Sequence, residues 1–64
     1  MALTANTFRE ALRLANAAGL DAGNRSAKRV GRADWSGDDY DAACDTIETV
    51  LCALGYAESW QRAA

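Results

Sequence analysis

Apolar residues recur every three or four positions through the second half of the chain. They are Tyr40, Ala43, Cys44, Ile47, Val50, Leu51 and Leu54. An α-helix has 3.6 residues per turn, so this spacing places all seven side chains on one face. The pattern predicts a helix over residues 37–54, with this face turned toward the protein interior.

Both ends of this helix carry boundary signals. Ser36 is a good N-cap residue, and Asp39 stands three positions later, where its carboxylate can reach back to the cap. Trp35 and Tyr40 occupy the two positions of a hydrophobic staple. Gly55 suits the left-handed residue that ends many helices, and the next residue can then fold back onto the last turn.

The N-terminal part of the chain predicts a second helix. Thr7 and Glu10 fit a capping box at its start. An apolar face follows, which consists of Phe8, Ala11, Leu12, Ala15 and Ala18. Gly19 followed by Leu20 is typical of a C-terminal stop, with Leu20 packing on Ala15.

Two interpretations are open for residues 20–32. In the first, the N-terminal helix stops at Gly19, and a separate short helix starts after Asp21 or Asn24 and ends at Gly31, which gives three helices. In the second, one helix runs from residue 7 to about residue 31 and forms a long hairpin with the last helix. Each internal glycine then costs the helix about 1 kcal/mol. The continuous helix would carry a stripe with a small-residue middle, made of Phe8, Leu12, Ala15, Gly19, Ala22, Ser26 and Val30.

Under either interpretation the chain is one small all-α domain over residues 1–64, with three helices or a long helical hairpin and no strands. No alternation of apolar and polar residues typical of a β-strand occurs. We further expect residues 57–62 to form a helical turn that lays Trp60 over the core.

The predicted core is thin. Half of the 64 residues count as hydrophobic, but 15 of them are alanines. A domain this small usually needs a disulfide, a metal, a partner chain or very good helix packing. Cys44 and Cys52 would lie about 12 Å apart on one helix, too far for a disulfide, and without histidine they cannot complete a zinc site. We therefore expect no metal and no cofactor, and we expect a homodimer in which helix faces rich in small residues pack together.

The sequence also bears on location. No apolar run approaches the length of a membrane span. Arg9, Glu10 and Arg13 interrupt the N-terminal apolar residues, so these do not form a signal peptide. We expect a cytoplasmic protein of the host cell without a membrane partner.

Two charged clusters of opposite sign adjoin each other. Arg25, Lys28, Arg29 and Arg32 follow helical spacing and would form one basic face. Asp38, Asp41, Asp45 and Glu48 would form an acidic ridge beside the apolar face of the last helix, with a charge about every 5 Å. This spacing is of the order of the charge spacing along a nucleic-acid backbone. Either cluster can instead be an ordinary solvated face.

Enzymatic activity is not expected. The chain has no histidine, which is the commonest general base. It contains no glycine-rich phosphate loop, nucleophile elbow or zinc motif. Carboxylates on an exposed helix lack the pocket that would tune them for acid–base chemistry. We therefore assign no catalytic residue.

A set of residues in the middle of the chain resembles small proteins encoded by phages and prophages. The set comprises Asn24-Arg25-Ser26, Gly31-Arg32, Trp35, Asp38-Asp39-Tyr40 and Ala42-Ala43. In size and acidity the chain is also similar to phage-encoded inhibitors of the anti-CRISPR type. That resemblance implies a non-enzymatic protein that covers the nucleic-acid-binding surface of a host complex, and it transfers no site residues.

The leading hypothesis is an interaction module that binds a host protein with a basic surface through the acidic ridge. One alternative is a nucleic-acid-binding regulator that uses the basic face, and another is a dimeric structural or assembly protein. The net charge of −2 and the acids that begin just beyond Arg32 predict only weak direct binding to nucleic acid.

Overall fold

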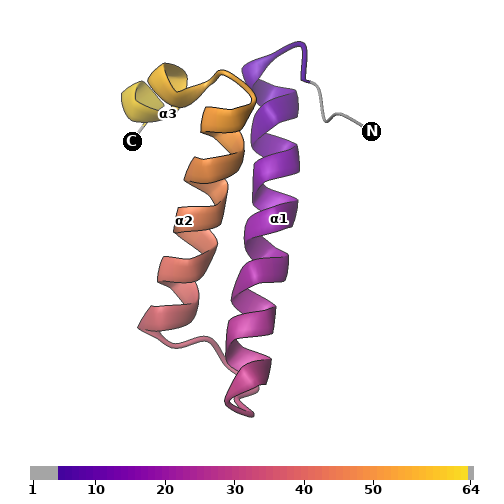
Figure 1. The fold of residues 1–64 in the computed structure, drawn as a ribbon, viewed down its shortest axis with the longest axis vertical. Coiled ribbons are helices and arrows are strands. Elements are labelled where there is room, and N and C mark those ends of the chain that lie inside the picture. Colours follow the sequence, from indigo (N-terminus) through magenta and orange to yellow (C-terminus); the bar gives the residue numbers. More distant parts are fainter. Residues whose placement is uncertain (1–4, 64) are drawn as a thin grey trace.

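The computed structural model describes residues 5–63, which form three α-helices and no strand (Figure 1). The helices are α1 (Phe8–Arg29), α2 (Gly37–Ala53) and α3 (Ala57–Ala63). α1 and α2 lie side by side and run antiparallel, and α3 turns away at the end of α2. The predicted all-α class is confirmed.

Local signals define both ends of α1. Thr7 caps the start, where its hydroxyl oxygen accepts a bond of 3.2 Å from the Glu10 N–H. Beyond the other end, Gly31 adopts a φ of 73°, and the Arg32 N–H donates to the Ala27 carbonyl at 2.9 Å. This is the Schellman arrangement, in which a left-handed glycine closes the last turn. The predicted boundaries at Thr7 and Gly31 are confirmed.

The predicted stop at Gly19 is wrong, because α1 runs through Gly19 and Gly23 as one helix of 22 residues. A Cβ at Gly19 would lie 2.7 Å from the Ile47 side chain. A Cβ at Gly23 would overlap the Trp35 ring. Packing of these bulky side chains onto bare backbone outweighs the cost of about 1 kcal/mol for each internal glycine. Of the two interpretations, the long hairpin is therefore correct, and α3 supplies the third helix.

The face that α1 presents to α2 differs from the predicted stripe. Its buried residues recur every four positions and are Ala11, Ala15, Gly19, Gly23 and Ala27. Val30 is 59% exposed, because it lies just beyond the last residue of the helix. Leu20 is 58% exposed instead of packing on Ala15, because the chain does not turn at Gly19. A row of small residues at this spacing lets α2 pack closely along α1.

α2 agrees with the helix predicted over residues 37–54. At its start, Asp39 accepts a bond of 2.8 Å from the Ser36 backbone N–H, as in a capping box. At its end, Gly55 has a φ of 88°, and the Tyr56 N–H donates to the Leu51 carbonyl at 2.8 Å. The predicted cap at each end is confirmed.

The apolar face of α2 is only partly covered. Ala43 and Leu51 are buried, whereas Tyr40 and Cys44 are exposed, contrary to the prediction. At 100° per residue, the seven apolar positions span about 120° of the helix surface. α1 covers less than that and α3 contacts α2 only near its end, so one edge of the face stays in solvent.

The main apolar cluster lies where α1 begins and α2 ends. Its fully buried members are Ala11, Ala15 and Leu51. The half-buried side chains packed around them are Ala5, Phe8, Leu12, Ile47, Val50, Leu54, Tyr56 and Trp60. The Tyr56 hydroxyl donates to the Ala5 carbonyl at 3.0 Å, which ties the segment before α1 to the segment after α2. Trp60 covers this core from α3, as predicted.

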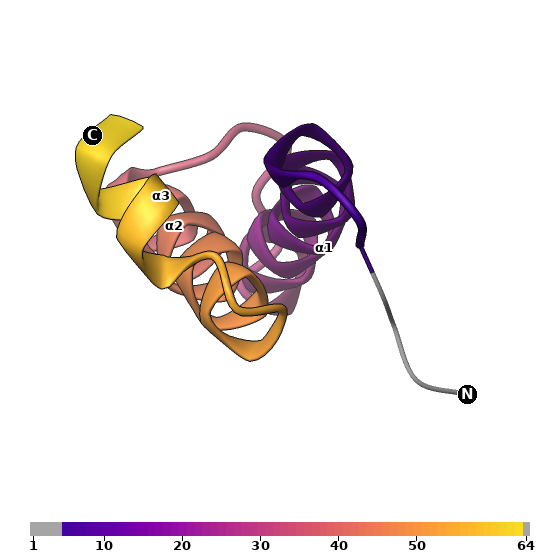
Figure 2. The same ribbon diagram turned by 90° about the horizontal axis from the view of Figure 1, so that it is seen from above.

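The described part of the protein is flat, with principal extents of 37 × 28 × 14 Å. Figure 2 shows α3 beside α2, on the side away from α1. α1 and α2 pack side by side, and away from the α3 end no other described element covers either broad face of the hairpin.

Candidate functional site

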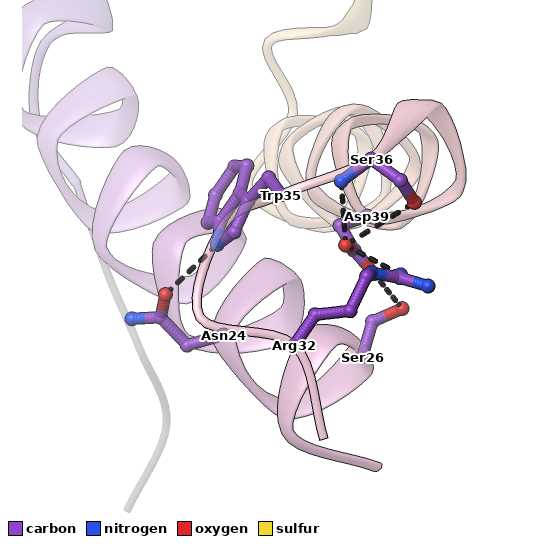
Figure 3. Close-up of polar contacts among 6 residues, drawn as sticks. All are labelled: Asn24, Ser26, Arg32, Trp35, Ser36 and Asp39. Carbon is purple, nitrogen blue, oxygen red and sulfur yellow. Dashed lines mark hydrogen bonds and ion pairs between the residues drawn. The ribbon is translucent and has the colours of Figure 1, made fainter. Parts of the chain in front are cut away.

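Several side-chain hydrogen bonds converge at the connection between α1 and α2 (Figure 3). Asp39 is the one charged side chain that is fully buried among the described residues. Its Oδ1 accepts a hydrogen bond of 2.6 Å from the Ser26 hydroxyl. Its Oδ2 accepts bonds of 2.7 Å from Arg32 Nη2 and 2.8 Å from the Ser36 N–H. The two helices and the segment between them therefore meet at one carboxylate.

These donors keep Asp39 ionised. The Ser26 hydroxyl, the Ser36 N–H and the Arg32 guanidinium hold the pKa of Asp39 well below its usual value of 3.8, and they outweigh the opposing effect of burial. Both oxygens are engaged and the side chain is buried, so Asp39 has no access to a substrate or a metal ion. It is a structural group. The sequence placed Asp39 only in the helix cap and missed these tertiary contacts.

Trp35 makes a second set of contacts at this connection. Its indole N–H donates to the Asn24 side-chain oxygen at 3.0 Å, and its ring packs on Gly23. Tyr40 meets the indole edge-on, with ring centroids 5.0 Å apart. The predicted staple between Trp35 and Tyr40 is confirmed, although Tyr40 is 58% exposed.

Six of the eleven residues on which the expected resemblance to phage proteins rests lie at this connection. Asn24 and Trp35 form one contact in Figure 3, and Ser26, Arg32 and Asp39 form the other. Gly31 closes α1 between them. The spacing of these residues is therefore explained by the hairpin itself, without a ligand.

The four acids of the predicted ridge lie together on the surface of α2. Asp38, Asp41, Asp45 and Glu48 are all exposed. Their positions are about half a turn around the helix from the buried Ala43. Neither of the two ion pairs within residues 5–63 involves them.

The basic cluster does not form the single helical face that its spacing predicted. Arg32 lies beyond the end of α1, and its guanidinium turns inward to Asp39. Arg25 makes an ion pair of 2.9 Å with Asp21, one turn earlier on the helix. Lys28 and Arg29 are exposed in the last turn of α1, where positive charge also complements the helix dipole. The end of the helix at Gly31 separates Arg32 from the other three.

A shallow groove of about 480 Å³ runs between α1 and α2 on one broad face. It is lined by Ala18, Asp21, Ala22, Arg25, Ser26, Arg29, Ala42 and Thr46. Most of its polar groups are engaged within the protein. The Ser26 hydroxyl bonds to Asp39, and the Thr46 hydroxyl donates to the Ala42 carbonyl at 2.8 Å. Asp21 and Arg25, which also line the groove, form the ion pair of 2.9 Å described above.

Cys44 and Cys52 are free thiols on the surface of α2. Within residues 5–63, no three side chains of His, Cys, Asp or Glu gather as a metal site. No helix in that range has both the length and the apolar character needed to cross a membrane. Comparison with protein-family models, with curated proteins and with solved structures found no match to this chain.

Proposed function

We propose that the protein is a non-enzymatic binding module whose acidic ridge docks onto a basic surface of another protein. The observation that supports this proposal is a contrast between carboxylates on the same helix. Asp39 is buried and fully engaged in holding the hairpin together. The ridge acids project from the other side of α2 and make no ion pair within the described residues. Asp38 also complements the helix dipole in the first turn of α2, but all four side chains remain exposed and available to a partner.

The arrangement of the ridge suits a surface that binds nucleic acid. Helical geometry spaces its charges by about 5 Å, which is of the order of the charge spacing along a nucleic-acid backbone. α2 is fixed by apolar packing near Leu51 and by the contacts of Asp39 near its start. A fixed helix loses little conformational entropy on binding. The ridge would thus compete with DNA or RNA for a site on a host complex, which is a common mode of action among phage inhibitors of the anti-CRISPR type.

The alternative of a nucleic-acid-binding regulator receives less support. Two members of the basic cluster are engaged inside the chain, Arg32 with Asp39 and Arg25 with Asp21. Lys28 and Arg29 are then the two members of the cluster that make no ion pair within the described residues, on a chain with a net charge of −2. Affinity for phosphates rises with the number of phosphates neutralised, so two side chains favour weak binding.

The test compares two charge-reversed variants. In the ridge variant, Asp41, Asp45 and Glu48 are replaced by Lys. In the matched control, Arg25, Lys28 and Arg29 are replaced by Glu. Immobilised wild-type protein and both variants are incubated with basic proteins that were recovered from a host lysate on heparin, and the retained proteins are then challenged with salt or duplex DNA.

We expect the wild-type protein and the control to retain a protein that salt or DNA releases, because the ridge and nucleic acid compete for one surface. The ridge variant should lose this protein while its circular dichroism remains helical, because the three replaced side chains are exposed. Retention by the ridge variant together with loss by the basic-cluster variant would contradict the proposal and favour the alternative.

A further inference from the structure

One broad face of the hairpin is apolar. Leu20 and Tyr40 are each 58% exposed, Cys44 is exposed, and Trp35 and Ile47 are half-buried. We refer to these five residues as the apolar face. Tyr40 and Cys44 lie about 160° around α2 from Ala42 and Thr46, which line the groove, so the apolar face lies on the other side of the hairpin.

The residues of the apolar face are neighbours. Trp35 contacts both Tyr40 and Gly23, and Leu20 lies one turn before Gly23 on α1. Cys44 follows Tyr40 by one turn of α2, and Ile47 follows Cys44 by three residues. They therefore form one continuous surface rather than isolated exposed side chains.

The architecture calls for a second layer on this face. Away from the α3 end, no described element covers this face of the hairpin, and the described part measures only 14 Å along its shortest axis. The fully buried cluster is only Ala11, Ala15 and Leu51, which is a small core for a chain of this length. We propose that a second copy of this chain covers the apolar face, so that two hairpins form an antiparallel four-helix bundle.

Charges beyond one end of the apolar face favour a second copy as the occupant. Arg13 lies on α1 two turns, about 10 Å, before Leu20 and in nearly the same direction from the helix axis, and Glu48 lies on α2 one turn after Cys44, so both stand beyond the same end of the face. Gly19 packs against Ala43 and Ile47, and this register places Arg13 within about one turn of the height of Glu48. Beyond this end of the face, the α1 side is therefore basic and the α2 side is acidic at nearly the same height.

A two-fold axis running along the hairpin makes these two sides complementary. It places α1 of each copy over α2 of the other at the same height, so Arg13 of each copy faces Glu48 of the other. Neighbouring helices are then antiparallel throughout, which is favourable for their dipoles. The contact is the same on both copies, as a closed dimer requires.

This interface differs from the one that the sequence predicted. The small residues of α1 were expected to meet a second chain, but Gly19 and Gly23 are already packed against Ile47 and Trp35 of the same chain. The dimer also leaves Asp38 and Asp45 exposed, because they lie further around α2 than Glu48. Glu48 belongs to both surfaces, so the dimer would cover one end of the acidic ridge. Replacements of Leu20 and Tyr40 distinguish the two proposals, because they leave all four ridge acids unchanged.

Sedimentation over a range of protein concentrations tests the proposal. The wild-type protein should sediment as a dimer, and a variant with Leu20→Ser and Tyr40→Ser should sediment as a monomer at the same concentrations. Val30→Ser is the matched control, because Val30 is 59% exposed but lies outside the apolar face. It should remain dimeric. A wild-type protein that is monomeric throughout, or a double variant that still dimerises, overturns the proposal.

Charge exchange tests the orientation without altering apolar residues. Arg13→Glu or Glu48→Arg alone should raise the dimer dissociation constant a few-fold, and the two together should restore it.

The reactivity of the two thiols gives a third measurement. Cys44, studied in a Cys52→Ser variant, should react more slowly with a thiol reagent as concentration rises, whereas Cys52 in a Cys44→Ser variant should not. Equal behaviour of the two thiols, or a combined charge variant no better than either single one, overturns this geometry.

Discussion

The two ends of the hairpin are held together by different forces. At the apolar end, where α1 begins and α2 ends, Leu51 is fully buried among half-buried aromatic and aliphatic side chains. At the polar end, where residues 30–36 connect the helices, hydrogen bonds converge on Asp39 and on the Trp35 indole. The first end buries large apolar side chains, and the second buries a carboxylate.

This difference assigns the stability of the fold to one end of the hairpin and the alignment of α1 with α2 to the other. Hydrophobic burial is non-directional, whereas hydrogen bonds of 2.6–2.8 Å to Asp39 require one arrangement of their donors. The apolar end therefore supplies most of the favourable free energy, and the polar end sets the register of α1 against α2. If α2 slid by one turn, Asp39 would lose Ser26 and would be left as a poorly compensated buried charge.

The largest expected effect lies at the apolar end. Leu51→Ala should lower the free energy of unfolding by about 2–5 kcal/mol, because it removes a fully buried side chain and leaves a cavity. In so small a domain that loss can unfold the protein. Urea denaturation followed by circular dichroism measures it, with Val30→Ala as the exposed control, expected to change stability by less than about 0.5 kcal/mol. A Leu51→Ala variant as stable as this control would show that the apolar end is not the main source of stability.

A smaller effect is expected at the polar end. Gly23→Ala should lower the free energy of unfolding by about 1–3 kcal/mol, because its methyl group would overlap the rigid Trp35 ring. The indole must then shift and weaken its bond to Asn24. Gly37→Ala is the matched control, since a Cβ there meets nothing within 4 Å and alanine favours a helix. Thermal unfolding should separate the two variants, and equal melting temperatures would contradict the close packing at Gly23.

The sequence predicted those parts of the fold that depend on local signals. Caps at Thr7, Ser36 and Gly55 coincide with changes in the apolar pattern, so three helix boundaries could be assigned. Gly19 followed by Leu20 gives the same local signal whether the chain turns or another helix packs there. The side chain that decides between them is Ile47, which is distant in sequence. Only tertiary contact could resolve this point.

The same limit applies to the candidate site. Exposure of the acidic ridge follows from helix periodicity alone, so the positions of Asp41, Asp45 and Glu48 on the surface could be predicted. The contacts of Asp39 could not, because Ser26 and Arg32 reach it only when α1 continues past Gly19 and ends at Arg29, with the left-handed Gly31 beyond it. That geometry also divides the basic cluster. One feature of the sequence could have indicated the contact between Arg32 and Asp39. The two residues carry opposite charges and stand close in sequence on either side of a turn.

The smallest expected change is an acid effect at the polar end that is absent at neutral pH. The pKa of Asp39 in the folded protein lies below its usual value of 3.8, so the folded state binds this proton less tightly than the unfolded state. The stability that Asp39 contributes as an anion is therefore complete above about pH 5 and is lost progressively as the pH falls through 3.8 toward the lower folded value. Urea denaturation from about pH 7 to about pH 3 should show a wild-type advantage over Asp39→Asn that is constant at first and shrinks in acid. Gly23→Ala disturbs the same end without removing a titrating group, so its deficit relative to wild type should not follow that curve. If the advantage over Asp39→Asn also stayed constant into acid, the ionised form of Asp39 would not be what aligns the two helices.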